Sequence, residues 1–304
     1  MTYCVAMRLN EGLVFLADSR TNAGVDQIST FRKMTVFERP GERLIVMMSA
    51  GNLAITQAVR QIVCEGTAPT GDPTQASIWQ ARSLFDAVRI IGEAVRSVHR
   101  QDGAALQEAG IEFNCSFIVG GQIRGEGLRL FHVYAAGNFI EATPENPYFQ
   151  IGESKYGKPI VDRVITPETS LGEAAKCALI SMDSTLRSNI SVGLPLDLLV
   201  YEAGSLRVSK FVRIDEHNEY MRMIRATWGD RLRQVFAEIP DPAWRDAPAG
   251  STGPRLETQE FQPVRAVAPA LMAGEAPPDT VAPPGAVPTI QLLAQQRSPQ
   301  CPST

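Results

Sequence analysis

Lysine, histidine and long apolar runs are all scarce in this 304-residue chain. Five residues are lysine, against 24 arginines, and three are histidine. No apolar run approaches the roughly 20 residues that cross a bilayer, and residues 1–8 lack both the basic and the apolar part of a secretory signal. The formal net charge of -4 argues against an electrostatic nucleic-acid binder. We therefore expect a cytoplasmic protein that contacts neither a membrane nor nucleic acid.

Cysteine is also sparse and does not form the patterns that disulfide frameworks or metal sites require. The five cysteines are an odd number, widely spaced and without a CxxC motif, and the histidines stand far apart. A Walker phosphate-binding loop is absent. The glycine-rich run at 120–127 lies between two apolar runs, which favours a hairpin loop. We expect reduced thiols, no metal ion and no cofactor.

Proline is rare in most of the chain and concentrated at its C-terminal end. Residues 240–304 contain 13 of the 21 prolines. This change in composition predicts a body at 1–239, long enough to bury a substantial core, and a disordered Pro/Ala-rich tail at 240–304. A linker or solvating appendage is the favoured role of the tail, and docking through the apolar patch at 289–293 is the alternative.

Apolar residues recur with strand-like and helix-like spacing through the body. The predicted strands occupy 3–9, 13–17, 33–38, 43–49, 112–119, 128–135, 139–141, 148–151, 196–201 and 206–214. The predicted helices occupy 51–66, 76–106, 155–164, 170–185 and 217–239. Because the strands follow one another in adjacent pairs, the sheets should be largely antiparallel. The order of strand groups and helix pairs predicts an α+β fold, specifically a four-layer αββα sandwich.

Thr2 is the first candidate for chemistry. A small residue after the initiator methionine normally permits removal of Met1, which would give Thr2 a free α-amine. The hydroxyl of such a threonine can attack a carbonyl while its own amine, with an ordinary pKa of about 7.7–8.0, accepts the proton. Threonine is common at position 2, so Thr2 by itself is weak evidence for a nucleophile.

Three further positions supply the groups that such a threonine would need. Asp18 ends an apolar strand, where its carboxylate could hold a cation. Lys33 opens the next strand; near Thr2 its charge would lower the pKa of the hydroxyl, and Asp18 would keep the lysine charged. Gly51 joins a strand to a helix, whose N–H groups can stabilise an oxyanion. Taken singly, Asp18 would be a turn residue, Lys33 a surface cation and Gly51 a glycine at the start of a helix. Their combination with Thr2 favours a hydrolase.

Together these residues resemble the proteasome β-subunit superfamily of N-terminal-nucleophile hydrolases. The pattern consists of Thr2, Ala-Asp-Ser-Arg at 17–20, Arg-Lys at 32–33 and Ala-Gly at 50–51, and the match covers about residues 2–239. The stretch 21–34 looks most like Anbu, the bacterial ancestral β-subunit branch. The resemblance implies the αββα fold and a threonine peptidase that acts on peptides or unfolded proteins. It also implies a homo-oligomer, either a ring or a helically offset open ring, and leaves any ATPase partner open.

The resemblance implies a role for each matching residue. Thr2 would be the nucleophile, with its own α-amine in proton transfer. Lys33 would tune the hydroxyl and Asp18 would orient Lys33, while the Gly51 N–H would serve the oxyanion. Ser191, within a segment similar to the family's Thr-x-Arg-Asp-x-x-Ser-Gly-Gly, would be the supporting serine.

Four further residues complete the predicted site. Ser49, at the end of a strand, and Arg20 are candidate substrate-binding residues. Two positions depart from the family's pattern around the amine: Ser188 stands where proteasomal subunits have aspartate, and Asn138 follows Gly137 where they have a Gly-Ser pair. These departures keep two alternatives open, a catalytically weak scaffold or regulatory homologue and an amidohydrolase that acts on small amides. Cys4 would not be terminal after Met1 removal and is expected to pack in a strand.

Overall fold

The computed structural model describes residues 2–22, 28–66, 77–244 and 253–256. Contacts divide the chain into two units, Met1–Pro240 and Asp241–Thr304. The first unit contains two five-stranded sheets and five α-helices among its described residues. Within those described residues, no helix is long and apolar enough to cross a membrane.

The first sheet contains the N-terminal hairpin at its centre. Its strand order is β10-β1-β2-β11-β12, and every neighbouring pair is antiparallel. The strands are β1 (Tyr3–Leu9), β2 (Gly12–Asp18), β10 (Tyr148–Gly152), β11 (Leu196–Glu202) and β12 (Lys210–Ile214). β1 therefore begins between β10 and β2, which come from distant parts of the sequence.

The second sheet is built from two consecutive hairpins and a short edge strand. Its order is β5-β6-β7-β8-β9, again antiparallel throughout. The strands are β5 (Met34–Arg39), β6 (Arg43–Gly51), β7 (Cys115–Ile123), β8 (Arg129–Val133) and β9 (Phe139–Glu141). The prediction of largely antiparallel sheets is confirmed, and the glycine-rich run lies across the β7–β8 hairpin as expected.

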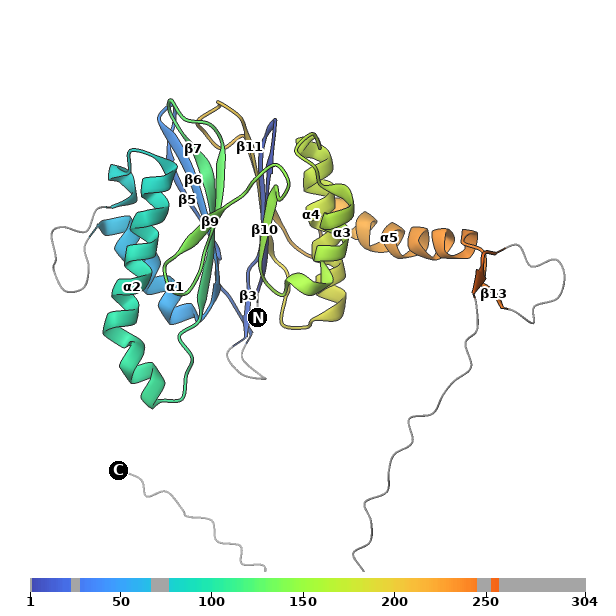
Figure 1. The fold of residues 1–304 in the computed structure, drawn as a ribbon, viewed down its shortest axis with the longest axis horizontal. Coiled ribbons are helices and arrows are strands. Elements are labelled where there is room, and N and C mark those ends of the chain that lie inside the picture. The colour runs from blue at the N-terminus through green and yellow to red at the C-terminus, as the bar shows by residue number, and fades with distance from the viewer. Residues whose placement is uncertain (1, 23–27, 67–76, 245–252, 257–304) are drawn as a thin grey trace, which may run out of the picture. The chain divides into compact units, whose positions relative to one another are not determined.

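Helices cover the outer face of each sheet (Figure 1). Those on the second sheet are α1 (Leu53–Glu65) and α2 (Leu84–Glu108), and those on the first are α3 (Lys158–Val164) and α4 (Leu171–Ser188). α5 (Glu219–Glu238) packs against α4 and extends away from the sheet. Buried apolar residues form three clusters: one between α1, α2 and the second sheet, one between the first sheet and its helices, and one between the sheets.

Alternation along β1 explains how one strand serves two clusters. Val5 and Met7 pack toward the helices, whereas Cys4 and Ala6 pack between the sheets, because successive side chains of a strand point to opposite faces. The strand is buried on both sides, and its starting position is consequently fixed by packing as well as by hydrogen bonds.

In the body, two predicted elements start four residues or more after the predicted position. The long helix begins at Leu84 rather than Ala76, because Ser83 caps it by accepting from the Asp86 N–H; a 3-10 turn, η1 (Ile78–Gln80), precedes it. The last strand begins at Lys210, not Leu206. The sequence also gave no prediction of the short antiparallel pair β3 (Arg20–Asn22) and β4 (Ile28–Thr30), which directly follows Asp18.

In the second unit, the structure describes one short parallel pair. β13 (Ala243–Trp244) pairs with β14 (Arg255–Leu256), a feature absent from the predicted disordered tail. The remaining tail prediction, including the docking alternative at 289–293, lies outside the described residues.

Candidate active site

Thr2 immediately precedes β1 and is 9% exposed. Its carbonyl oxygen accepts a hydrogen bond from the Glu153 N–H at 2.7 Å, and the next residue, Tyr3, lies opposite Gly152 at the end of β10. The start of the chain is thus held against an edge strand, and Thr2 has a defined position at one end of the first sheet.

Gly152 is the point of closest approach to Thr2. Its φ of 79° is left-handed, and a Cβ added there would overlap the Thr2 carbonyl oxygen and lie 3.3 Å from the Thr2 Cβ. Only glycine accommodates both the backbone conformation and this proximity without strain. Gly152 therefore sets the distance between β10 and Thr2.

Replacing Gly152 with alanine should displace Thr2 and destabilise the fold. We expect a loss of about 1–3 kcal/mol in the free energy of unfolding for the left-handed conformation alone, together with a loss of the reactivity that the sequence predicts for Thr2. Chemical denaturation and labelling of Thr2 measure the two effects. Gly204→Ala is the matched control, since Gly204 also has positive φ (77°) but nothing lies within 4 Å of its added Cβ. Equal reactivity losses in the two variants would contradict this role of Gly152.

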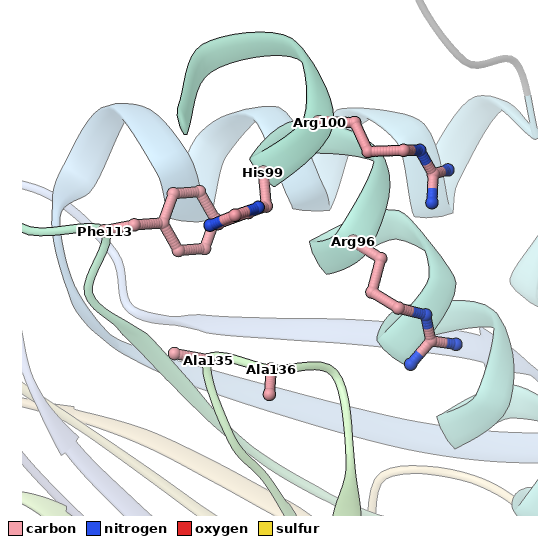
Figure 2. Close-up of a pocket in the computed structure, with 6 residues that line it drawn as sticks. All are labelled: Arg96, His99, Arg100, Phe113, Ala135 and Ala136. Atoms are coloured by element: carbon pink, nitrogen blue, oxygen red, sulfur yellow. The ribbon is translucent and has the colours of Figure 1, made fainter. Parts of the chain in front are cut away.

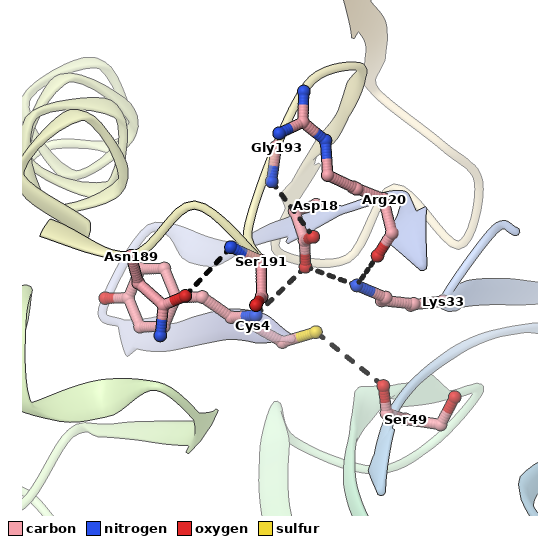
Figure 3. A network of polar contacts seen from close by, with 9 residues as sticks. Cys4, Asp18, Arg20, Lys33, Ser49, Asn189, Ser191 and Gly193 are labelled. Atoms are coloured by element: carbon pink, nitrogen blue, oxygen red, sulfur yellow. Dashed lines mark hydrogen bonds and ion pairs between the residues drawn. The ribbon is translucent and has the colours of Figure 1, made fainter. Parts of the chain in front are cut away.

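Asp18 is the centre of the polar network shown in Figure 3. This fully buried carboxylate ends β2. Its Oδ1 accepts from Lys33 Nζ at 2.7 Å and from the Tyr3 N–H at 2.9 Å, and its Oδ2 accepts from the Gly193 N–H at 3.4 Å. Burial raises the pKa of the Asp18 carboxyl, whereas the Lys33 ammonium and the two N–H groups act in the opposite direction.

Lys33 is equally well fixed. Its side chain is 7% exposed, and Nζ also donates to the Arg20 carbonyl oxygen at 2.7 Å. The Ser49 N–H donates to the Lys33 carbonyl oxygen at 3.0 Å. Because Lys33 Nζ and the Tyr3 N–H bind the same oxygen of Asp18, the ammonium lies beside the peptide group that follows Thr2.

Gly51 ends β6, the strand next to this network. Its φ is 110°, and a Cβ added there would overlap the Asn114 carbonyl oxygen. Asn52 then caps α1 by accepting from the Ala54 N–H at 3.0 Å. Cys4 reaches the same strand, since its thiol lies 3.9 Å from the Ser49 carbonyl oxygen. Burial raises the pKa of the Cys4 thiol, which suits a packed side chain rather than a nucleophile.

The loop after α4 brings Ser191 and Gly193 toward Asp18 (Figure 3). The Ser191 N–H donates to Asn189 Oδ1 at 2.9 Å, which fixes a turn, and Arg20 lies across the loop by donating from Nη1 to the Ile190 carbonyl oxygen at 3.1 Å. A Cβ on Gly193 would overlap the Arg20 guanidinium. Arg20 therefore links this loop to Lys33: its guanidinium binds the loop, and its carbonyl oxygen accepts from Lys33 Nζ.

The two predicted departures lie outside this hydrogen-bonded network. Ser188 is the exposed last residue of α4. Asn138 is exposed in the β8–β9 turn, where its carbonyl oxygen accepts from the Tyr134 N–H at 2.9 Å. Contacts of this turn run to α2, because the Gly137 carbonyl oxygen accepts from Arg96 at 3.1 Å. Among the described residues, hydrogen bonds connect the peptide after Thr2, Asp18, Lys33, Arg20 and the loop after α4, whereas Ser188 and Asn138 make no hydrogen bond or ion pair to Asp18 or Lys33.

Three positions near the site were missed from the sequence. Gly193 donates to Asp18, Glu153 donates to Thr2, and Ser19 is buried beside Asp18 with no hydrogen-bond partner for its Oγ among the described residues. Ser19 directly follows Asp18 in the run at 17–20, so the sequence already placed it next to this carboxylate. For Glu153 the available signal was Gly152, a glycine between the strand predicted at 148–151 and Glu153.

A separate pocket of about 540 Å³ lies at α2 and is lined by six residues (Figure 2): Arg96, His99, Arg100, Phe113, Ala135 and Ala136. Arg96 and Arg100 both pair with Glu93, at 3.0 and 2.9 Å. The two guanidinium groups share this single carboxylate, so the three side chains together retain one positive charge at the pocket. Among the described residues, no group of three His, Cys, Asp or Glu side chains could hold a metal ion.

Solved structures show what this chain is similar to. Anbu (ancestral beta-subunit) from Yersinia bercovieri is 54% identical; the match covers 79% of this chain and 98% of that one, with a TM-score of 0.72. The chain belongs to the Anbu family. A Gly-1 mutant of Anbu from Hyphomicrobium sp. strain MC1 is 49% identical, with 79% and 99% covered and a TM-score of 0.73. The helical assembly of the Anbu complex from Pseudomonas aeruginosa is 47% identical, with 80% and 98% covered and a TM-score of 0.74. No protein-family model and no curated protein gives a significant match.

Proposed function

We propose that this member of the Anbu family is a threonine-type peptidase whose nucleophile is Thr2 after removal of Met1. The observation that carries the proposal is the buried Lys33–Asp18 pair, whose shared carboxylate oxygen also accepts from the Tyr3 N–H. A buried ion pair costs desolvation energy and is weak evidence for stability alone. Its position beside the first peptide of β1 supports a role in activating Thr2.

The proposed reaction proceeds in two halves. The Thr2 hydroxyl oxygen attacks the amide carbon, and its proton passes to the Thr2 α-amine. The C–N bond of the tetrahedral intermediate breaks, and the leaving amine takes that proton. Water then adds to the resulting ester, and cleavage of the C–O bond releases the acid and restores the hydroxyl. Lys33 favours the developing negative charge on the Thr2 oxygen, while Asp18 holds the lysine.

The remaining residues have supporting roles in this proposal. The Gly51 N–H stabilises the oxyanion, for which preorganised donors are typically worth about 10²–10³ in rate. Ser191 supports the site from the turn after α4. Ser49 and Arg20 line the substrate side, and Ser188 and Asn138 remain more distant influences on the amine. The substrate class is a peptide or an unfolded protein.

We infer that the enzyme works as a cytoplasmic homo-oligomer with the layers of a proteasome-type αββα sandwich. The helical assembly of the Pseudomonas aeruginosa relative supports a helically offset open ring, with a closed ring as the alternative. Apolar residues exposed on α5 and at the residue that caps its end, namely Leu232, Val235, Phe236 and Ile239, fit packing between subunits. In this proposal the catalytic domain is 1–239, and 240–304 is an appendage.

Two alternatives keep the family but change the function. The exposed positions of Ser188 and Asn138, outside the Asp18 network, favour a catalytically weak scaffold or regulatory homologue. An amidohydrolase would use the same Thr2 chemistry on small amides. Parallel peptide and small-amide libraries, assayed with wild type and Thr2→Ala, separate these functions. Thr2-dependent peptide cleavage supports the peptidase, Thr2-dependent cleavage confined to small amides supports the amidohydrolase, and turnover equal in both proteins contradicts both enzymes.

A further inference from the structure

Glu153 lies directly opposite Thr2. β1 and β10 pair with Tyr3 opposite Gly152, so continuing the antiparallel register by one residue places Glu153 opposite Thr2. The 2.7 Å hydrogen bond from the Glu153 N–H to the Thr2 carbonyl oxygen agrees with this register. Gly152, which is left-handed, turns the chain toward Thr2 at this point, since a Cβ added to it would lie 3.3 Å from the Thr2 Cβ. A carboxylate is therefore brought to the residue that would carry the α-amine.

The Glu153 carboxylate is poorly compensated by the cation beside it. The Glu153 side chain is only 16% exposed, whereas Lys155, whose Nζ lies 3.7 Å from Glu153 Oε2, is 70% exposed. Such an exposed, long ion pair is weak because water and salt screen it. A carboxylate that is largely removed from water retains a need for a second positive partner.

We propose that Glu153 is a positioning residue that holds the Thr2 α-amine and stabilises its protonated form, so that the amine accepts the hydroxyl proton more readily. The inference rests on the proposed Thr2 chemistry and adds to it a residue from outside the Lys33–Asp18 pair. An opposite charge within about 4–6 Å raises the pKa of an amine. Glu153 would thus act on the amine, whereas Lys33 acts on the hydroxyl.

The charged groups around the amine come from several elements. Asp18 at the end of β2 is already bonded to Lys33 and to the Tyr3 N–H. Lys33 precedes β5, Glu153 follows β10, and Lys155 lies in the 3-10 turn η2 (Ser154–Tyr156). Arg20 is directed to the Ile190 carbonyl. The two carboxylates near the amine are Asp18 and Glu153. Asp18 has a short, buried ion pair with Lys33, whereas the only ion pair of Glu153 among the described residues is long and exposed.

The test is the pH dependence of the rate at which a threonine-directed electrophile labels Thr2. The amine must be neutral to accept the proton, so the rate falls on the acid side of its pKa. Glu153→Gln removes the charge and should move the midpoint of this acid limb down by about one pH unit, which raises the rate about tenfold at the acid end. Glu153→Asp should stay near wild type, as should Glu145→Gln, which alters an exposed carboxylate.

The outcomes separate this inference from the function on which it rests. No labelling of wild-type Thr2 at any pH overturns both. Normal labelling with an unchanged acid limb in Glu153→Gln overturns the role of Glu153 alone. If the melting curve shows that Glu153→Gln does not fold, Lys155→Gln replaces it as the test. Without the lysine, the Glu153 carboxylate should stabilise the protonated amine more strongly, and the midpoint of the acid limb should move to higher pH. An unchanged midpoint overturns the inference.

Discussion

Replacing Thr2 with alanine should reduce amide hydrolysis by about 10⁴-fold or more, because removal of a nucleophile leaves only binding and oxyanion stabilisation. The fold should survive, since the backbone contacts of Thr2 run through its carbonyl oxygen to Glu153 and do not need the hydroxyl. Steady-state kinetics on a cleaved substrate measure the first effect, and thermal melting measures the second.

Two matched variants interpret this result. Thr2→Ser retains a hydroxyl and an α-amine after Met1 removal, so it should keep a substantial part of the rate. Thr227→Ala removes an exposed threonine from α5 and should leave activity unchanged. Hydrolysis by Thr2→Ala at the wild-type rate would place the nucleophile elsewhere.

Replacing Lys33 with methionine should be the most destabilising of the site substitutions, because it leaves the Asp18 carboxylate buried without a cation. Breaking a buried pair in this way typically costs about 3–5 kcal/mol at neutral pH, and hydrolysis should fall as well. Denaturant unfolding measures the stability, with the exposed Lys176 on α4 changed to methionine as the control. A loss no larger than that of Lys176→Met would show that Asp18 does not depend on Lys33.

The pH dependence of Lys33→Met follows from the direction of the Asp18 shift. Burial raises the pKa of Asp18 in the folded state, and losing Lys33 removes a group that opposes this. A carboxyl with a raised folded pKa binds its proton more tightly when folded, so stability falls as pH rises through that range. The variant should therefore be least impaired in acid. Asp18→Asn with Lys33→Met should regain stability without regaining hydrolysis.

Local patterns account for the parts of the fold that the sequence predicted. The apolar residues of β1 and β2 meet across a short turn, so their pairing needs only neighbouring residues. Asp18 and Lys33 lie 15 positions apart, close enough for their chemistry to be considered together. Anbu membership, predicted from these residues and confirmed by the solved relatives, followed from the same short segment.

Long-range pairing explains what the sequence could not reveal. Glu153 reaches Thr2 only because β10 joins the edge of the first sheet next to β1. Gly193 reaches Asp18 because the loop after α4 leads into β11, which pairs with β2. The start of α2 was misjudged because apolar spacing continues through η1, whereas the cap at Ser83 decides where the helix begins.

Intact-mass analysis before and after treatment with a threonine-directed electrophile tests the central claim most directly. The proposed chemistry predicts a protein that begins at Thr2 and gains one adduct, which peptide mapping places on Thr2 and which is lost in Thr2→Ala. Assembled, active protein that retains Met1, or an adduct located at another residue, would contradict Thr2 as the nucleophile.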